Sequence, residues 1–211
     1  MEFSHYSVML EECIAGLAIR PDGIYVDGTA GGAGHSCQIA KRLTDGKLFA
    51  LDKDPDAVNI AEQRLAPYAQ ATVIQADFRD LCCTLKERGI TGVDGILLDL
   101  GVSSYQLDTA ERGFSYHQDA PLDMRMSKTG PSAQDLVNTY SAEDLSRIIR
   151  EFGEEKYAWS IAKNIEKARA KAPITTTGQL AEIIRESMPY SARREKNPAK
   201  KTFQAIRIAV N

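Results

Sequence analysis

The sequence is poor in the residues that build disulfide frameworks and metal centres. Four cysteines and three histidines occur among its 211 residues. Cys82 and Cys83 are adjacent, and no two cysteines have the C-x-x-C spacing of a zinc site. The three histidines are scattered and do not form a metal-ligand pattern. We therefore expect reduced thiols and no metal centre, and the pattern excludes a small disulfide-stapled domain.

Long hydrophobic runs and a signal peptide are also missing. No apolar stretch approaches the ~20 residues of a membrane-spanning helix. The segment Met1–Cys13 carries acids where a signal peptide carries lysines, and it has no continuous apolar core. We therefore expect a cytoplasmic protein without a membrane partner. An apolar fraction of 43% and a charged fraction of 26% are typical of a folded globular chain.

Positive charge is scarce in the first part of the chain and concentrated in the last part. Residues 1–149 contain 13 Lys and Arg against 22 Asp and Glu, a balance of −9. Residues 150–211 contain 13 against 7, a balance of +6. The basic stretch Arg193–Lys201 holds five cations and one acid, and it is the candidate for contacting a phosphate backbone. The alternative is a solvated surface that keeps the chain soluble.

Strand and helix patterns alternate through the first hundred residues. Segments rich in β-formers are separated by helical patterns of about ten residues, which predicts βαβ units. We expect an α/β fold with a doubly wound parallel sheet that is covered by helices on both faces. The expected strands are 24–27, 47–51, 71–74 and 93–98, and the expected helices are 8–18, 35–43, 55–65 and 79–88.

After Leu100 the pattern changes to a long loop, residues 101–130, and then to helices. Ser141 and Thr176 provide N-cap side chains for two of these helices. The chain ends at Phe203–Asn211, within a helical pattern that has not reached a cap, and four strands are few for this fold. We therefore expect a truncated chain. The expected helices of this part are 133–139, 142–150, 154–170 and 177–187.

A glycine-rich loop, Gly28–Gly34, follows the first expected strand. Glycines at this place let the backbone approach a ligand closely, and the next helix begins with free N–H groups. The loop lacks the G-x-G-x-x-G spacing of dinucleotide sites, and the chain has no G-K-[ST] motif of a P-loop. It resembles the first motif of S-adenosylmethionine-dependent methyltransferases. The alternative is a tight strand-to-helix turn that binds nothing.

Carboxylates stand at the expected carboxyl ends of three strands: Asp27, Asp52 and Asp99. Doubly wound sheets bind their ligands at this edge. Asp52 is placed to accept two hydrogen bonds from a ribose diol, unless it is simply a solvated carboxylate. Asp77 and Phe78, after the third strand, suit adenine recognition by hydrogen bonding and stacking. Asp77 can also serve as the N-cap of the next helix.

Methylation at a ring carbon and methylation at an amine need different nucleophiles. Methylation of a pyrimidine at carbon 5 requires an attacking thiolate. Cys82 and Cys83 lie within a helical pattern, and we expect them to be core residues. Methylation of an exocyclic amine needs no nucleophile from the protein. Asp99 is the candidate catalytic residue, because a carboxylate can hold the amine N–H and turn its lone pair toward the methyl group.

Several stretches of the chain together resemble one family, the bacterial ribosomal RNA small subunit methyltransferase H family, also called RsmH or MraW. The resemblance covers the whole chain. It implies a Rossmann-like S-adenosylmethionine-dependent methyltransferase that methylates the N4 amine of a decoding-centre cytidine in 16S rRNA of the small ribosomal subunit. The stretches are His5–Leu10, Asp27–His35, Leu51–Asp54, Asp99–Ser104, Arg112–Ser115, Pro121–Met126 and Thr202–Ile208.

The resemblance also implies a domain organisation and a set of site residues. Residues 1–114 would form the N-terminal part of the methyltransferase domain, 115–201 an inserted helical domain, and 202–211 the start of the helix that returns. The family continues beyond this point, so we expect a C-terminally truncated chain. His35 is assigned to the cofactor and not to a general base. The residues that would line the cofactor site are Ala33, Gly34, His35, Asp52, Phe78, Asp99 and Gln106.

Three alternatives remain open at this level. The loop Arg112–Met126, with Phe114, Tyr116, Met124 and Arg125, either clamps a flipped cytosine or packs as a lid on the edge of the sheet. A nicotinamide-dependent oxidoreductase could use the same fold, although the dinucleotide spacing is missing. A non-catalytic RNA-binding or assembly module with a vestigial cofactor loop is the other possibility. The oligomeric state is not predicted.

Overall fold

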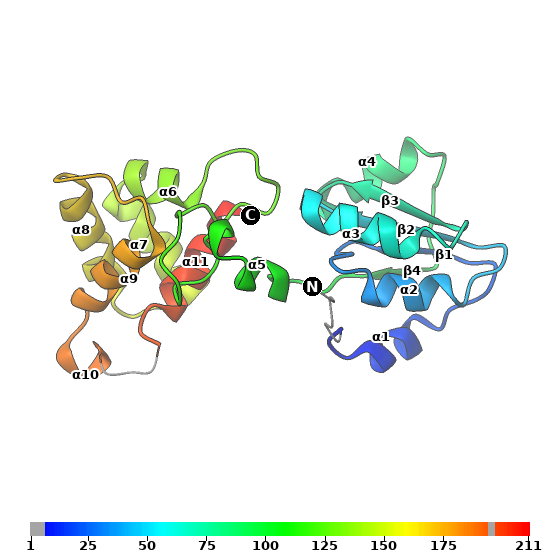
Figure 1. Ribbon diagram of the computed structural model, residues 1–211, viewed down its shortest axis with the longest axis horizontal. Helices are drawn as coiled ribbons and strands as arrows, with labels where there is room; N and C mark the ends of the chain where they lie inside the picture. The colour runs from blue at the N-terminus through cyan, green and yellow to red at the C-terminus, as the bar shows by residue number, and fades with distance from the viewer. Residues whose placement is uncertain (1–6, 194–196) are drawn as a thin grey trace. The chain divides into compact units, whose positions relative to one another are not determined.

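The computed structural model describes residues 7–193 and 197–211. The chain divides into two compact units, residues 1–101 and residues 102–211 (Figure 1). The first unit is the α/β unit and the second is the helical unit. Each unit has its own hydrophobic core, so each is described by itself.

The α/β unit is built on a four-stranded parallel sheet with the order β3-β2-β1-β4. The chain adds β2 and β3 on one side of β1 and then returns to add β4 on the other side, as in a doubly wound fold. The predicted fold class is therefore confirmed. The strands are β1 (Ile24–Asp27), β2 (Lys47–Asp52), β3 (Ala71–Gln75) and β4 (Gly95–Leu97), and the helices are α1 (Leu10–Leu17), α2 (Gly34–Ala40), α3 (Pro55–Leu65) and α4 (Leu81–Lys86), with a 3₁₀ turn η1 (Phe78–Asp80).

Alternate residues of the strands face two separate clusters of buried side chains. Leu48 of β2 packs with residues of α1, α2 and α3 on one face of the sheet. Phe49 and Leu51 of the same strand pack on the other face with Leu85 of α4. Both faces of the sheet are thus covered, which explains why the strand sequences are almost continuously apolar.

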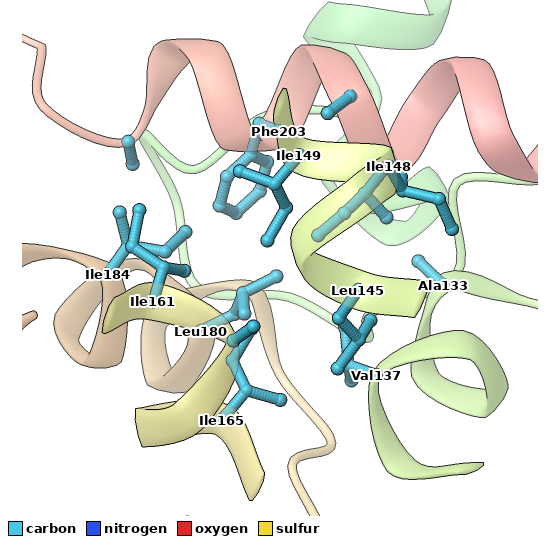
Figure 2. Packing of buried hydrophobic residues seen from close by; sticks show 14 of the residues in the cluster. Ala133, Val137, Leu145, Ile148, Ile149, Ile161, Ile165, Leu180, Ile184 and Phe203 are labelled. Carbon is cyan, nitrogen blue, oxygen red and sulfur yellow. The ribbon is translucent and has the colours of Figure 1, made fainter. Parts of the chain in front are cut away.

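The helical unit packs around one core that includes residues of α6 to α9 and α11. In Figure 2, Phe203 of α11 and Ile149 of α7 point toward each other, with Ile161 and Leu180 nearby. The chain's one tryptophan, Trp159, is 49% exposed on α8. The helices are α5 (Ser104–Asp108), α6 (Ala133–Thr139), α7 (Ala142–Gly153), α8 (Ala158–Arg169), α9 (Thr177–Glu186), α10 (Tyr190–Arg193) and α11 (Lys200–Val210), with a 3₁₀ turn η2 (Ala110–Arg112).

Side-chain caps fix the starts of α7 and α9 in this unit. The Oγ atom of Ser141 accepts the N–H of Asp144 at 3.0 Å, and Thr176 forms a capping box with Gln179. These are the two N-caps that the sequence predicts.

The division between the two units differs from the predicted domain boundaries. Phe114 and Met124 are both buried in the core of the helical unit. The boundary between the two units therefore lies between Gly101 and Val102, earlier in the chain than the predicted domain boundary after residue 114. Residues 202–211 were predicted to start the helix that returns to the methyltransferase domain. Most of them belong to α11, which packs against α7 within the helical unit. The assignment of 115–201 as an inserted domain stays a prediction about the family.

Two predictions of secondary structure are wrong. Residues 101–130 were expected to be a loop, but α5 and η2 form there. A helix was expected over 154–170, whereas α8 begins only at Ala158. The reason is Glu154, which adopts a left-handed conformation (φ 51°) and ends α7 with its N–H bonded to Arg150 O.

Among the helices that the structure describes, none has the length and apolar character that a membrane-spanning segment requires.

Candidate active site

The glycine-rich loop is fastened to the strands on both sides of β1. The backbone N–H of Gly28 donates to Leu97 O of β4 at 2.9 Å, and that of Ala30 donates to Leu51 O of β2 at 2.8 Å. The loop therefore follows the carboxyl ends of β2, β1 and β4. This is the edge at which a doubly wound sheet binds its ligand.

Two loop residues have left-handed backbone conformations. Gly31 has φ 50°, and Ala33, the residue before α2, has φ 59° and is fully buried. Gly28 is required for a different reason, because a Cβ atom there would lie 2.5 Å from Leu98 Cδ2 and 3.2 Å from Phe78 Cβ. Both the turn and its close contact with the neighbouring strand ends thus depend on small residues.

Asp27 is buried beneath the loop and supports it. Its Oδ1 accepts the N–H of Thr29 at 3.1 Å, and its Oδ2 accepts the hydroxyl of Ser36 at 2.6 Å. Burial raises the pKa of the Asp27 carboxyl, and these two hydrogen bonds oppose the rise. With 1% of its surface exposed, Asp27 shapes the loop and does not face a ligand.

Asp52 ends β2 beside the same loop and remains partly exposed. Its Oδ2 accepts the N–H of Gly31 at 2.8 Å, and its Oδ1 accepts the N–H of Asp54 at 2.9 Å. Burial raises the pKa of Asp52, and the bonds from Asp54 and Gly31 oppose the rise. A carboxylate has about four lone-pair positions, so Asp52 keeps acceptor capacity for further donors.

Gly34 and His35 form the first turn of α2, next to the chain segment that precedes α1. A Cβ atom on Gly34 would lie 2.0 Å from Ser7 Oγ, so this segment covers the glycine closely. The His35 ring is 5% exposed, and its Nε2 lies 3.2 Å from Val8 O, to which it can only donate. A buried ring that donates to a carbonyl through Nε2 is poorly placed for general-base chemistry. The backbone N–H groups of this first turn have no acceptor within α2 itself.

Asp77 acts as a helix cap, which was the structural alternative in the sequence. Its Oδ1 accepts the N–H of Arg79 at 2.9 Å, and its Oδ2 lies 2.6 Å from the Arg79 guanidinium and 3.4 Å from Lys53 Nζ. Burial acts to raise the pKa of Asp77, but the hydrogen bonds from Arg79 and the charge of Lys53 outweigh it and the pKa is lowered. Phe78, half-buried, begins η1 directly after it.

Asp99 lies two residues beyond β4 and is exposed. Its backbone N–H donates to Thr29 Oγ1 at 2.7 Å, which attaches the end of β4 to the glycine-rich loop. Among residues 7–193 and 197–211, its carboxylate makes no hydrogen bond or ion pair. Thr29 was not singled out in the sequence analysis, although a threonine directly after the first glycine of the loop is the signal that could have indicated this link.

Gln106 belongs to the helical unit, in α5, and is 5% exposed. Its Oε1 accepts the N–H of Ser103 at 3.0 Å, and its own N–H donates to Ser103 Oγ at 3.2 Å. These bonds form a capping box at the start of α5. The other predicted cofactor residues lie in the α/β unit, so the role of Gln106 at the cofactor stays a prediction.

The proposed base clamp in Arg112–Met126 is wrong for two of its members. Phe114 is 1% exposed and Met124 is 0% exposed, and both pack in the core of the helical unit. The guanidinium of Arg125 is bound by Asp123 at 2.6 Å. The aromatic and apolar side chains here are already used in packing, so Phe114 and Met124 cannot stack on a base.

Two further expectations change with the structure. Cys82 and Cys83 were expected in the core, but both are exposed on α4, a helix that buries only Thr84 and Leu85. Arg193, from the basic stretch, donates to the backbone carbonyls of Met188 and Glu186 at 2.7 and 2.8 Å. Residues 194–196 of that stretch, with two of its cations, lie outside the described residues.

Within the described residues, no group of three His, Cys, Asp or Glu side chains could hold a metal ion.

The model of the MraW methylase family matches residues 2–211. The chain is 55% identical to "Ribosomal RNA small subunit methyltransferase H 2" of Agathobacter rectalis, over all of this chain and 69% of that protein. It is 52% identical to "Ribosomal RNA small subunit methyltransferase H" of Limosilactobacillus fermentum, over all of this chain and 68% of that protein. A crystal structure of a putative rRNA-methylase from Clostridium thermocellum covers 47% of this chain and 57% of its own, at 16% identity and a TM-score of 0.37, too low to support an argument.

Proposed function

The chain belongs to the MraW methylase family, and we propose that it transfers a methyl group from S-adenosylmethionine to the N4 amine of a cytidine in 16S rRNA. The observation that carries this proposal is the attachment of two strand-end aspartates to one loop, Asp52 through its carboxylate and Asp99 through its backbone N–H. Asp52 accepts the N–H of Gly31, and the N–H of Asp99 donates to Thr29. A carboxylate for the cofactor and a carboxylate for the acceptor amine are thereby held on the same few residues. The names of the relatives support the rRNA substrate, and such a substrate agrees with a cytoplasmic location.

The residues of the loop suit S-adenosylmethionine better than a dinucleotide. Asp52 has acceptor capacity left for the two hydroxyls of a ribose. The chain lacks the G-x-G-x-x-G spacing that brings a backbone close to a pyrophosphate. His35 would contribute through its backbone, since its ring is bonded to Val8. The proposed cofactor residues are Ala33, Gly34, His35, Asp52, Phe78, Asp99 and Gln106.

The chemistry needs orientation more than activation by the protein. When bound, S-adenosylmethionine supplies a methyl group on a positively charged sulfur. The exocyclic amine of cytosine is conjugated with the ring and is a weak nucleophile. Asp99 would accept a hydrogen bond from one N4–H and turn the nitrogen lone pair toward the methyl group. As the N–C bond forms, the bond from the methyl carbon to sulfur would break with its electron pair left on sulfur, and the displaced N4 proton would pass to the Asp99 carboxylate and on to solvent. Positioning of this kind accounts for large rate effects in bimolecular reactions.

Two measurements test this function. Calorimetry of S-adenosylmethionine with the chain should show binding, whereas a spectroscopic titration with NADH should show none. Transfer of a tritiated methyl group to small ribosomal subunits should follow, with the label recovered as N4-methylcytidine. NADH binding in place of S-adenosylmethionine would favour an oxidoreductase. RNA binding without binding of S-adenosylmethionine would favour a non-catalytic assembly module.

A cysteine variant separates amine methylation from carbon methylation. Replacing both Cys82 and Cys83 with Ala should leave methyl transfer unchanged, because the proposed chemistry uses no thiolate. Both side chains are exposed, so the fold should also be retained. A folded double variant without activity would contradict the proposal of amine methylation.

A further inference from the structure

A cavity of about 230 Å³ lies in the helical unit, remote in sequence from the glycine-rich loop. Lys156, at the connection from α7 to α8, lines it together with Lys200 and Lys201 at the start of α11. Met188 and Ala192, both buried, form part of its apolar wall. The cavity thus combines an apolar wall with three ammonium groups.

Three other cations of the same unit, as the structure describes it, are already engaged. Lys163 pairs with Glu166, and Arg185 pairs with Glu182. Arg193, next to the cavity wall, is bonded to two backbone carbonyls. The carboxylates neutralise the charges of Lys163 and Arg185, and the carbonyls occupy two donors of Arg193.

The lysines of the cavity differ from those cations. Across the described residues, no carboxylate lies within ion-pair distance of the ammonium of Lys156 or Lys200. Lys156 Nζ lies 5.0 Å from the centre of the Tyr157 ring, a cation–π contact that orders its position. Lys201 Nζ donates to Glu154 O at 3.1 Å, and an ammonium group has two further protons to donate.

One acid also lines the cavity, and it does not neutralise these charges. Glu155 is 5% exposed, and its Oε1 accepts the N–H of Tyr157 at 2.9 Å. Among the lining residues that the structure describes, three lysines against one glutamate leave the cavity positive. Helix α11 begins here as well, and its N-cap residue, Ala199, makes no side-chain hydrogen bond. The positive end of the helix dipole adds to the same potential.

We propose that this cavity binds a phosphodiester group of single-stranded RNA, with Lys156 and Lys200 contacting the phosphate oxygens. The proposal rests on the RNA substrate of the proposed function, but it concerns a second site. The cavity is smaller than the ~300–1,000 Å³ of pockets for drug-sized ligands, so it suits one phosphate and its sugar. The excess of positive charge in residues 150–211 agrees with a backbone contact in this part of the chain.

Lysine footprinting tests the contact without altering the protein. The full chain is acetylated with an amine-reactive ester, with and without a single-stranded fragment of small-subunit rRNA, and the modified lysines are identified by mass spectrometry. RNA should protect Lys156 and Lys200 several-fold, while Lys167 and Lys171, at the other end of α8, should keep their reactivity. Equal protection of both pairs, or no protection, would overturn the proposal.

A pair of double variants gives the energetic test. Lys156→Gln with Lys200→Gln should weaken RNA binding and lower the slope of log affinity against log salt by about 0.7 for each lost contact. The matched control, Lys167→Gln with Lys171→Gln, removes the same charge and should leave the slope near the wild-type value. Lys156→Arg, which keeps the charge, should retain affinity. Equal slopes in the two glutamine variants would overturn the proposal.

Two further arms separate the possible sources of failure. Millimolar inorganic phosphate is used as the second probe, and protection by phosphate that RNA does not reproduce would overturn the assignment to an RNA backbone. Binding of S-adenosylmethionine is measured on the same samples. Protected lysines without cofactor binding would contradict the proposed function alone, whereas cofactor binding with unprotected lysines would contradict the cavity site alone.

Discussion

The carboxylate of Asp52 accepts the backbone N–H of Gly31 at 2.8 Å. The side chain that we assign to the ribose of the cofactor therefore also fixes the turn of the loop that would surround it. Loss of this side chain should affect both the ligand and the loop.

Asp52→Ala should weaken the binding of S-adenosylmethionine by ~1.5–3 kcal/mol, the usual effect of losing hydrogen bonds to a charged group. Because the variant also loses its bonds to Gly31 and Asp54, the α/β unit should lose about 1–3 kcal/mol of stability. Calorimetry on the folded protein measures the first effect. Asp45→Ala, an exposed aspartate just before β2 at the opposite edge, is the control and should change neither quantity. Unchanged affinity in a folded Asp52→Ala variant would remove Asp52 from the site.

Asp99→Asn tests whether the carboxylate of Asp99 orients the amine that accepts the methyl group. The amide keeps the shape of the side chain but loses its charge and one acceptor, so methyl transfer should fall by about two orders of magnitude or more. Cofactor affinity should fall less, because the backbone N–H that bonds to Thr29 is retained. Rates are measured with small ribosomal subunits and affinities by calorimetry. Equal losses in both would mean that Asp99 serves the cofactor and that another residue orients the amine.

Gly31→Ala tests the left-handed turn of the loop. A Cβ atom there meets no atom closer than 3.8 Å, so the cost should come from φ 50° alone and amount to ~1–2 kcal/mol. Gly16→Ala in α1, where a Cβ meets nothing within 4 Å, should instead stabilise the unit by ~0.5–1 kcal/mol. Hydrogen exchange of the β1 and β2 amides measures both changes. Two variants with the same sign would contradict the backbone assignment.

Asp27→Asn should change how stability depends on pH. Burial raises the pKa of Asp27 above its usual 3.8, so the folded state binds a proton more readily than the unfolded state. The contribution of Asp27 to stability therefore decreases as pH rises from the unfolded pKa through the folded pKa. The asparagine can keep both hydrogen bonds, since the Ser36 hydroxyl can rotate to accept one. The stability of the wild type relative to this variant should thus fall with rising pH.

Asp77→Asn is the control of opposite sign for the pH prediction. The pKa of Asp77 is lowered, so its contribution is present above the unfolded pKa and is lost as pH falls through the folded pKa. The wild type should become more stable relative to this variant as pH rises. Urea unfolding with hydrogen exchange of the sheet amides, at several pH values, measures both differences. The same trend in the two variants would contradict one of the two pKa directions.

The sequence predicts those features that depend on local chemistry. β1, α3 and α6 have the predicted boundaries, because β-branched residues, Pro55 after the cap Asp54, and the cap Ser132 act on their neighbours. The positions of Asp52 at the end of β2 and of Asp99 just beyond β4 were predictable for the same reason. A strand pattern places its last residues at one edge of a parallel sheet.

Features that depend on distant residues could not be predicted in this way. The apolar pattern around Phe114 and Met124 is compatible with an exposed clamp or with a core, and only the packing against α11 and its neighbours decides it. Cys82 and Cys83 look apolar in a helical pattern, yet α4 turns another face to the sheet. The bond from Asp99 to Thr29 spans 70 residues and has no local signal except the threonine itself.

The single tryptophan lies on α8 of the helical unit, whereas Asp27, Asp52 and Asp99 lie in the α/β unit. Trp159 is about half exposed, with Lys163 Nζ 5.7 Å from its ring, so its emission responds to the surroundings of α8. Because the two units have separate cores, their unfolding transitions need not coincide. An intrinsic-fluorescence melt therefore measures the unit that holds the lysine-lined cavity, and a midpoint obtained from it does not describe the unit that holds the glycine-rich loop.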